Sequence, residues 1–461
     1  MNEIESSLIT NKHIFLCIPE QVNTLECYHK EVTNLQSHFC GLVFTDIKTC
    51  EEYMNMTSAN IGQVDDTMIY ICGDILKNYT ELKDLLQIVL PLKWNIIQEL
   101  SHNYEEKDIE ITITNSQLIG LGQVPLNIYN TGVYFRKYFN SNRKSKLKDY
   151  FDLVSHEHEF QSLTESDKPS DALRTGIYLT KIVEEVKEEL KLNLLRCSSN
   201  LRGPTGNFKE IDVDIVNQVN TLSSLFFKHS SPLNHVLAQV YENKLFTKSN
   251  DSSSIARDSS VSSVSSLLVE KKAKIKEHSD KSKDMNRNGL IAFCTFYKSK
   301  SQVNDVPNNI QGNVSEEDIF DYRYKKVTVL TKLRFRLKKT VTDTTLKKQF
   351  DIVLYPDSVF IISLWTNRLY THEIVPSVLP LDKLPIRLGY VIRCSKTEAV
   401  FKNNQMFIYE NGTCIPLQQP DIEGVKELKA LYSKENVTDE VIHYRKFYFS
   451  LNKGDYERPI V

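Results

Sequence analysis

The chain has 461 residues, of which 41% are hydrophobic and 25% are charged, and its formal net charge at pH 7 is -2. A chain this long and this apolar is not fully disordered, and it has room for about two or three globular domains. The near-neutral charge excludes an overall attraction to polyanions. Nine cysteines without any C-x-x-C pair argue against a zinc ribbon and a disulfide framework, so we expect reduced thiols.

The chain shows no targeting or membrane signal. Residues 1–5 contain no basic segment followed by an apolar run, and nowhere do about 18 apolar residues follow one another. We therefore expect no membrane span and a cytoplasmic or nuclear location.

Residues 1–145 are expected to form an N-terminal α/β region. Apolar runs at 13–18, 41–45 and 68–75 predict short strands, and residues 82–100 have the spacing of apolar positions that is typical of a helix. No catalytic or binding motif stands out in this region, so its role is not predicted.

Residues 146–461 are expected to form the second unit, in which strands are predicted at 172–182 and 191–197. The motif His156-Glu157-His158-Glu159 offers a rival set of metal-ligating side chains. Its alternation and acidic neighbours are more typical of a solvated loop or helix start. It also lacks the downstream partners of the site described below, which makes it the weaker candidate.

A Ser-rich insertion is expected to interrupt the second unit at about 247–270. Serine dominates at 252–254 and 262–266, and aromatic residues are scarce. Such a composition cannot bury enough apolar surface to offset the entropy lost on ordering. We therefore predict that this insertion is disordered.

Two histidines and one aspartate form a candidate iron site. Residues i and i+2 of a strand project to the same side, so His278 and Asp280 are expected to point together. The β-branched and aromatic runs at 360–364 and 370–374 include His372, the third candidate. Two imidazoles and one carboxylate can hold Fe(II) on one face and leave the other positions open for a keto acid and dioxygen.

The segment 387–393 is predicted to be a strand with two different faces. Arg387 and Arg393 share one face with Gly389 and Val391, and Leu388, Tyr390 and Ile392 form the other. Two guanidinium groups that face one interior need an anion between them. A dicarboxylic keto acid fits, because arginine binds carboxylates through a planar fork of donors and keeps its charge when buried.

One further strand carries alternating positive charge. Lys332, Arg334, Arg336 and Lys338 alternate with apolar residues, which predicts one cationic face and one apolar face. A nucleic-acid backbone could bind to the cationic face. The alternative is an ordinary solvated outer face of a sheet.

The order of these motifs resembles the AlkB-like branch of the 2-oxoglutarate- and Fe(II)-dependent dioxygenases. That family carries an H-x-D, a later histidine and an R-x5-R strand, which correspond to His278, Asp280, His372, Arg387 and Arg393. The resemblance covers about residues 225–400.

An upstream N-x-Y strand of the family is similar to 237–243, and the apolar strand after the H-x-D is similar to 290–296. Tyr241 would then hydrogen-bond the keto acid. Gln239 stands where the family usually has Asn. Lys281 and Ser282 stand where nucleic-acid repair members tend to have an acidic residue.

The resemblance implies an α+β protein, with a double-stranded β-helix (jelly-roll) core after the N-terminal α/β region. It implies Fe(II) held by His278, Asp280 and His372, and 2-oxoglutarate held by Arg387 and Tyr241. The implied activity is hydroxylation or demethylation of a nucleic acid or protein substrate. The alternative is a non-catalytic β-helix scaffold for regulated protein-protein interaction, in which the iron site would be empty or incomplete. The enzyme interpretation fails if His278, Asp280 and His372 do not converge within metal-bonding distance. The oligomeric state is not predicted.

Overall fold

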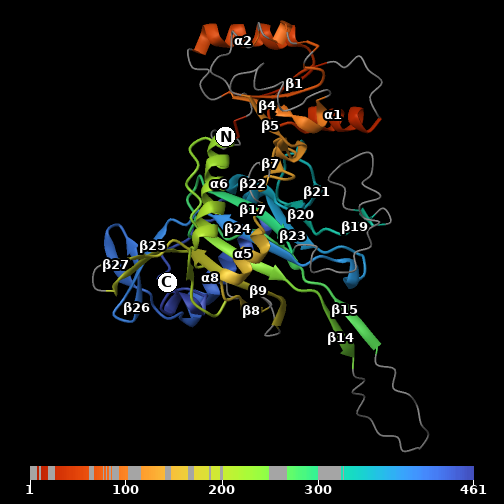
Figure 1. Ribbon diagram of the computed structural model, residues 1–461. Coiled ribbons are helices and arrows are strands. Elements are labelled where there is room, and N and C mark those ends of the chain that lie inside the picture. The colour runs from red at the N-terminus through yellow and green to blue at the C-terminus, as the bar shows by residue number, and fades with distance from the viewer. Residues whose placement is uncertain are drawn as a thin grey trace, which may run out of the picture.

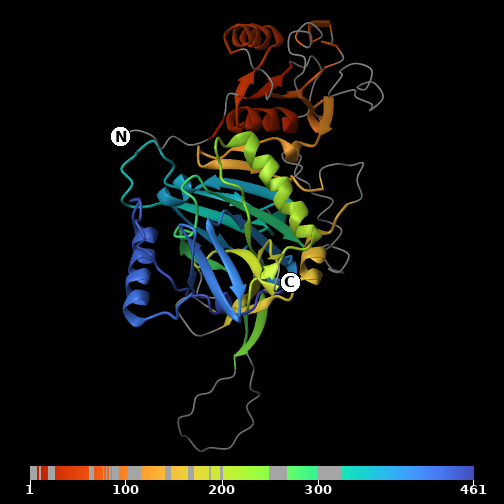
Figure 2. The same ribbon diagram turned by 90° about the vertical axis from the view of Figure 1, so that its left-hand side faces the viewer.

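The computed structural model describes most of the chain in three regions. An N-terminal sheet lies at one end, a pair of sheets in the middle and a smaller sheet beside them (Figure 1, Figure 2). The described residues are 8–9, 12–18, 26–61, 67–75, 77–78, 80–82, 85, 93–101, 116–140, 147–164, 171–185, 188–197, 201–248, 267–298, 323–324 and 327–461.

A five-stranded parallel sheet makes up the N-terminal region. Its strand order is β2-β1-β3-β4-β5. Phe15 and Ile71 are examples of its fully buried side chains, as expected for parallel strands that are covered on both faces. The elements are β1 (His13–Cys17), α1 (Glu26–His38), β2 (Leu42–Phe44), α2 (Ile47–Ile61), β3 (Met68–Cys72), β4 (Lys93–Ile97) and β5 (Ser116–Ile119).

The strands expected at 13–18, 41–45 and 68–75 are confirmed as β1, β2 and β3. The helix expected over 82–100 is wrong in its second part, because β4 occupies 93–97. There, Trp94 is almost fully buried, and β4 pairs with a parallel strand on each side. This long-range pairing of aromatic and β-branched residues overrides the local helical spacing.

A nine-stranded, mostly antiparallel sheet forms the centre of the molecule. Its order is β12-β9-β13-β24-β17-β22-β7-β6, and β8 also pairs with β9. The strands are β6 (Leu126–Asn127), β7 (Gly132–Phe135), β8 (Gln161–Thr164), β9 (Asp171–Thr180), β12 (Gly206–Asn207), β13 (His235–Tyr241), β17 (Leu290–Tyr297), β22 (Ser358–Ser363) and β24 (Arg387–Arg393).

A four-stranded antiparallel sheet faces the larger one. Its order is β16-β23-β20-β21, and successive strands from β13 to β24 pass back and forth between the two sheets. Phe360 of the larger sheet and Phe335 of the smaller one contact each other with ring centroids 5.8 Å apart, within one shared apolar core. The strands are β16 (Ile275–His278), β20 (Lys332–Leu337), β21 (Gln349–Val353) and β23 (Tyr370–Val375).

Helices cover the opposite face of the nine-stranded sheet (Figure 2). Ile215 and Val219 lie one helical turn apart on α6, and they share a core with Leu388 and Tyr390 of β24. One side of β24 therefore faces α6 and the other faces the four-stranded sheet, which confirms the predicted alternation of its side chains. The helices outside the N-terminal region are α5 (Tyr150–Glu157), α6 (Glu210–Phe226), α7 (Leu364–Leu369) and α8 (Ile422–Val437).

A second five-stranded sheet, with the order β10-β11-β25-β26-β27, lies beside the central pair. It has its own apolar core, which includes Leu192 and Phe401. The strand expected at 191–197 is confirmed as β11. The strands are β10 (Val183–Glu184), β11 (Leu190–Leu194), β25 (Thr397–Lys402), β26 (Gln405–Glu410) and β27 (Thr413–Pro416).

Two hairpins complete the described strands. β14 and β15 project from the central sheets (Figure 1), and β18 and β19 form a short pair. Residues 249–266, most of the Ser-rich insertion expected at 247–270, lie outside the described residues, whereas its two ends belong to β14 and β15. The strands are β14 (Lys244–Lys248), β15 (Leu267–Lys271), β18 (Arg323–Tyr324) and β19 (Val327–Thr328).

The domain boundary expected at residue 145 does not coincide with the point where one sheet ends and the next begins. The parallel sheet ends at Ile119, whereas β6 and β7 already belong to the central sheet through the pairing of β7 with β22. Contacts also cross this junction, since Arg136 pairs with Glu31 of α1 and Phe226 stacks on His13 with ring centroids 4.0 Å apart.

Two composition-based expectations can be compared with the described part of the chain. Eight cysteines there are free thiols. No helix among the described residues is long and apolar enough to cross a membrane.

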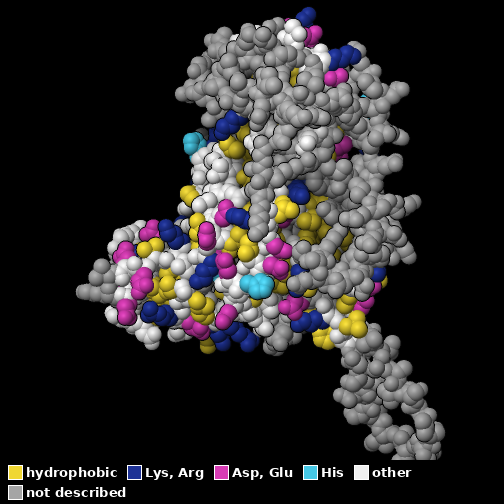
Figure 3. All heavy atoms as spheres, in the orientation of Figure 1, with side chains coloured by type: hydrophobic (Ala, Val, Ile, Leu, Met, Phe, Trp, Pro, Cys, Tyr) yellow, Lys and Arg dark blue, Asp and Glu magenta, His cyan; other side chains and the backbone are white. Residues whose placement is uncertain are grey.

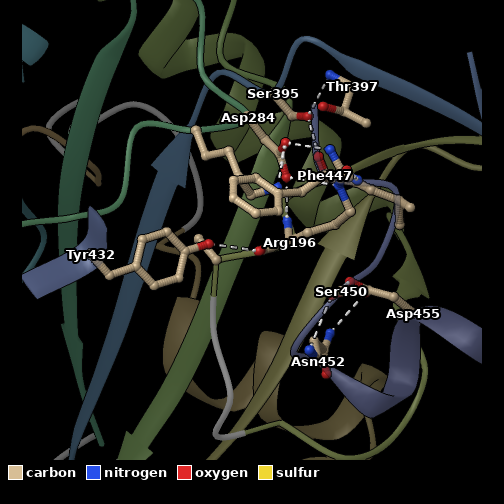
Figure 4. A network of polar contacts seen from close by, with 12 residues as sticks. Arg196, Asp284, Ser395, Thr397, Tyr432, Phe447, Ser450, Asn452 and Asp455 are labelled. Carbon is tan, nitrogen blue, oxygen red and sulfur yellow. Dashed lines mark hydrogen bonds and ion pairs between the residues drawn. The ribbon is translucent and has the colours of Figure 1, made fainter. Parts of the chain in front are cut away.

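A buried ion pair fixes the segment after the H-x-D motif (Figure 4). Arg196 donates from Nε and Nη2 to the two carboxylate oxygens of Asp284 at 3.1 and 2.8 Å. Its Nη1 donates to the Phe447 carbonyl at 2.8 Å, and the Tyr432 hydroxyl donates to the Arg196 carbonyl at 3.1 Å. Burial by itself raises the pKa of Asp284, but Lys283 and Arg196 outweigh it and hold this pKa well below its usual range.

Replacing Arg196 with Ala should destabilise the protein, because it leaves Asp284 buried without its bidentate partner. Breaking a buried pair in this way costs about 3–5 kcal/mol of unfolding free energy. Urea unfolding followed by circular dichroism measures the change. Lys191→Ala removes the exposed pair with Glu185 and is the control, with an unchanged midpoint expected. Equal midpoints for both variants would contradict a structural role of the buried pair.

Asp455 gives the stability of the fold a specific pH dependence. It accepts hydrogen bonds from Ser450 Oγ at 2.6 Å and Asn452 Nδ2 at 2.8 Å, and burial raises its pKa to about 7. An aspartate in the unfolded chain has a pKa of about 3.9. Between these two values the unfolded chain releases a proton that the folded chain keeps, so the unfolding free energy falls as the pH rises.

Asp455→Asn should remove this part of the pH dependence. Relative to the variant, the wild type should lose at most about 4 kcal/mol of unfolding free energy between pH 4 and pH 7, and no more above pH 8. Urea unfolding of both proteins at pH 5, 6, 7 and 8 measures the difference. Parallel pH profiles would show that Asp455 ionises normally in the folded protein.

Candidate metal centre

His278, Asp280 and His372 converge where β16 ends beside the middle of β23. β16 ends at His278, and the register between β16 and β23 places His278 opposite His372. Their ring centroids are 4.5 Å apart. The Nε2 atoms of His278 and His372 lie 3.5 and 3.9 Å from Asp280 Oδ1. One ligand atom from each residue lies within 4.8 Å of the others, so the group could hold a metal ion.

Both imidazoles are prepared to act as ligands. His278 Nδ1 lies 2.9 Å from the Lys276 carbonyl, and because a carbonyl only accepts, Nδ1 donates this bond and Nε2 is the ring atom directed towards Asp280. Burial lowers the pKa of His372 to about 3, so this ring is neutral near pH 7. A neutral imidazole is the form that binds metals.

The carboxylate of Asp280 is shared between an arginine and the two imidazoles. Arg393 Nε donates to Asp280 Oδ2 at 2.7 Å, while Oδ1 faces the histidines. Burial raises the pKa of Asp280, but Arg393 and His278 lower it more, and the pKa lies well below its usual range. Asp280 is therefore an anionic ligand whose charge is already partly balanced.

Main-chain contacts hold the Asp280 segment in place. The Asp280 N–H donates to Asn367 Oδ1 at 2.9 Å, and Asn367 Nδ2 donates back to the Asp280 carbonyl at 2.8 Å. Ser279 is buried and donates from Oγ to the Tyr370 carbonyl at 3.1 Å. These bonds orient the ligands before any metal binds.

A second group of side chains lies along the same inner face. Tyr241 is opposite Arg387, and Gln239 is opposite Gly389, across β13 and β24. The Arg387 guanidinium lies 3.8 Å over the Tyr241 ring, and the Tyr241 hydroxyl donates to Gln239 Oε1 at 3.2 Å. A Cβ at position 389 would lie 2.9 Å from Arg387 Nη1, so Gly389 keeps space beside the guanidinium.

Arg387 is buried without a counter-ion in the described part of the chain. Its side chain is only 3% exposed, and Nε and Nη2 have no hydrogen-bond partner there. Arginine stays protonated even when buried. The site is therefore suited to an anion beside Arg387.

One pocket of about 370 Å³ contains both groups. The metal-ligand group, Arg387 and Arg393 line it together with apolar side chains such as Phe293. Its volume is within the range of about 300–1,000 Å³ that small-molecule sites occupy. A larger hollow of about 780 Å³ lies beside Asp284, and none of the candidate iron ligands lines it.

The rival motif does not form a metal site. His158 is buried and its Nε2 lies 2.7 Å from Asp212 Oδ2, whereas His156 is exposed and its ring contacts the Asp152 carbonyl. Among the described residues, His278, Asp280 and His372 are the group that meets the distance requirement for a metal. The motif lies at the end of a helix and not at the expected helix start, because α5 ends at Glu157 and has His156 in its last turn.

The basic strand is not a free cationic face. Arg334 pairs with Asp351 at 2.6 and 2.8 Å, and Arg336 pairs with Glu277 and Glu373 at 2.6 and 2.7 Å. These positive charges are therefore balanced within the protein.

Lys338 does not belong to the expected cationic strand face, because it lies beyond the end of β20 and is buried. Its Nζ donates to the carbonyls of Arg368 and Glu435 at 2.7 Å. These carbonyls lie near the C-terminal ends of α7 and α8, so Lys338 caps both helices and is not available to a substrate. A substrate-facing role for Lys332 stays a prediction.

One pocket residue was missed by sequence reasoning. Arg174 lies on β9, opposite Tyr241, and lines the pocket. The strand at 172–182 was expected, but nothing in its local pattern indicates which strand it pairs with. Only the pairing of β9 with β13 brings Arg174 to this site.

Comparison with known proteins gives little support. No protein-family model and no curated protein sequence matches the chain. A solved structure described as "The structure of OsALKBH1" matches 57% of this chain and 97% of its own, with 11% sequence identity and a TM-score of 0.29. A similarity this weak supports no conclusion about function.

His372→Ala should weaken metal binding, because it removes one of three ligands. We expect the affinity for Mn(II), measured by isothermal titration calorimetry, to fall by at least about tenfold to a hundredfold. His156→Ala is the matched control from the rival motif and should bind Mn(II) like the wild type. Weaker Mn(II) binding in His156→Ala together with unchanged binding in His372→Ala would place the metal at the rival motif.

Proposed function

We propose that this protein is an Fe(II)- and 2-oxoglutarate-dependent dioxygenase of the AlkB type. The observation that carries the proposal is a single pocket in which a His-Asp-His group and a buried arginine without a counter-ion face the same space. The strand orders β13-β24-β17-β22 and β16-β23-β20-β21 fit the two sheets of a double-stranded β-helix.

The residues present fit the two cofactors. His278, Asp280 and His372 would hold Fe(II) on one face, as this ligand set does in non-haem iron oxygenases. When bound, Fe(II) and 2-oxoglutarate supply oxidising power, since dioxygen is consumed as the keto acid becomes succinate and carbon dioxide and a substrate C–H bond is hydroxylated. Hydroxylation of an N-methyl group would lead to demethylation.

Arg387 would bind the carboxylate of 2-oxoglutarate that lies far from the metal. Its free Nε and Nη2 suit a carboxylate, which accepts two parallel hydrogen bonds from one guanidinium. The Tyr241 ring supports the guanidinium from one side, and Gly389 leaves room beside it. Gln239 accepts a hydrogen bond from the Tyr241 hydroxyl and thereby fixes the direction of that hydroxyl.

Arg393 has a positioning role. It binds Asp280 Oδ2 and leaves Oδ1 directed towards the imidazoles, so a metal would meet one defined carboxylate oxygen. Arg393 and Asp280 are each only 6% exposed. Electrostatic interactions are stronger away from water.

The scaffold alternative predicts an empty or incomplete iron site. The three candidate ligands converge within 4.8 Å, so the geometric condition for an enzyme is met, and this supports the dioxygenase proposal.

Anaerobic addition of Fe(II) and 2-oxoglutarate tests the proposal. We expect the visible charge-transfer band of an iron-chelated keto acid in the wild type and its loss in His278→Ala. Arg387→Gln should weaken 2-oxoglutarate binding about tenfold to a hundredfold, because it removes a charge-assisted hydrogen bond. His156→Ala serves as the control and should keep the band. A folded, metal-loaded wild type without the band would refute the proposal.

A further inference from the structure

Arg174 is a third arginine in the candidate pocket. It lies opposite Tyr241 on one side, and Arg387 lies opposite Tyr241 on the other, so the three residues form one row across β9, β13 and β24. Arg174 is only 6% exposed. Its Nε has no hydrogen-bond partner, and no carboxylate pairs with the guanidinium in the part of the chain that the structure describes. A buried guanidinium N–H without an acceptor is costly, which indicates a missing anion.

The keto acid alone does not balance this pocket. Of the arginines that line it, Arg393 is paired with Asp280, whereas no carboxylate among the described residues pairs with Arg174 or Arg387. A dianionic keto acid would offset these two positive charges, and Fe(II) would add two more. A second anionic group is therefore favoured.

Arg174 and Arg387 lie on opposite sides of Tyr241 in the nine-stranded sheet. The strands that carry the two arginines are separated by β13, and two strand spacings amount to roughly 10 Å. The Tyr241 ring between them already contacts Arg387. An anion on Arg174 would thus occupy a subsite distinct from that of the keto acid.

The wall beside Arg174 is apolar. Leu163, Tyr178 and Leu201 form a buried cluster there, and Leu237 packs against it. All four line the pocket, with Leu163 on β8, Tyr178 on β9 and Leu237 on β13. A ligand in this subsite would meet apolar side chains along its body and one guanidinium at its end.

We infer that the substrate of this site is an acid with an apolar body, whose carboxylate or phosphate group binds Arg174. This inference rests on the proposed dioxygenase function and adds the class of substrate to it. The apolar body packs against the cluster of Leu163, Tyr178 and Leu201 and directs a C–H bond towards the candidate metal ligands. Arg174 is a specificity-determining residue, because it selects an anion over a neutral or cationic molecule.

Calorimetric titration tests this inference without turnover. Hexanoate, hexyl phosphate, neutral hexan-1-ol and the cation 1-methyladenosine are each titrated into the protein, with and without Mn(II) and 2-oxoglutarate. We expect at least one of the two acids to bind the wild type, and hexan-1-ol and 1-methyladenosine to bind at least tenfold more weakly. Whichever acid binds more tightly identifies carboxylate or phosphate as the preferred group.

Variants assign the binding to Arg174. Arg174→Gln should weaken acid binding at least tenfold and change 2-oxoglutarate affinity less than twofold, whereas Arg387→Gln should do the opposite. Arg174→Lys keeps the charge and should retain part of the acid affinity. Thermal melting of each variant checks that it is folded.

The outcomes separate this inference from the proposed function. If Mn(II) and 2-oxoglutarate do not bind the wild type, the dioxygenase proposal fails, and the inference that depends on it fails too. If they bind but neither acid does, or if acid binding is unaffected by Arg174→Gln, only the substrate inference is overturned. It is also overturned if Arg174→Gln weakens 2-oxoglutarate as much as Arg387→Gln does, because Arg174 would then be a second clamp on the keto acid.

Discussion

The buried ion pair between Arg393 and Asp280 is the interaction on which the site depends. Asp280 lies between two sheets, where an unpaired carboxylate would be strongly disfavoured. Arg393 enters from β24 and binds one carboxylate oxygen at 2.7 Å, which leaves the other for the imidazoles. The same strand carries Arg387 on the same face. One strand thus places both the group that balances the candidate metal ligand Asp280 and the group suited to an anion.

The segment that bears Asp280 is held on two sides. Asn367 of α7 bonds its main chain on one side, and Arg196 binds Asp284 a few residues later on the other. Bonds of this kind fix ligand geometry in advance and reduce the reorganisation needed on binding. The same network joins the metal-ligand segment to the C-terminal part of the chain, through the bond from Arg196 to Phe447.

Positive charge is distributed unequally between the surface and the pocket. Lys and Arg side chains are interspersed with Asp and Glu over the coloured part of one face (Figure 3), and Arg334 and Arg336 of β20 are paired with carboxylates. Arg174 and Arg387, in contrast, lie buried in the pocket without counter-ions in the described structure. A near-neutral protein therefore contains a strongly cationic cavity, and this local excess is more informative about the ligand than the net charge of -2.

The sequence by itself determined the features that depend on neighbouring residues. Alternation along a strand placed Arg387 and Arg393 on one face. The H-x-D spacing predicted that His278 and Asp280 lie together, and they do, although β16 ends at His278 and Asp280 follows it. The tertiary structure alone decided which distant strands meet. Pairing of β16 with β23 brought His372 to the other ligands, and pairing of β9 with β13 brought Arg174 into the pocket. Local periodicity reports which face a residue occupies, but strand pairing depends on long-range packing that no local pattern contains.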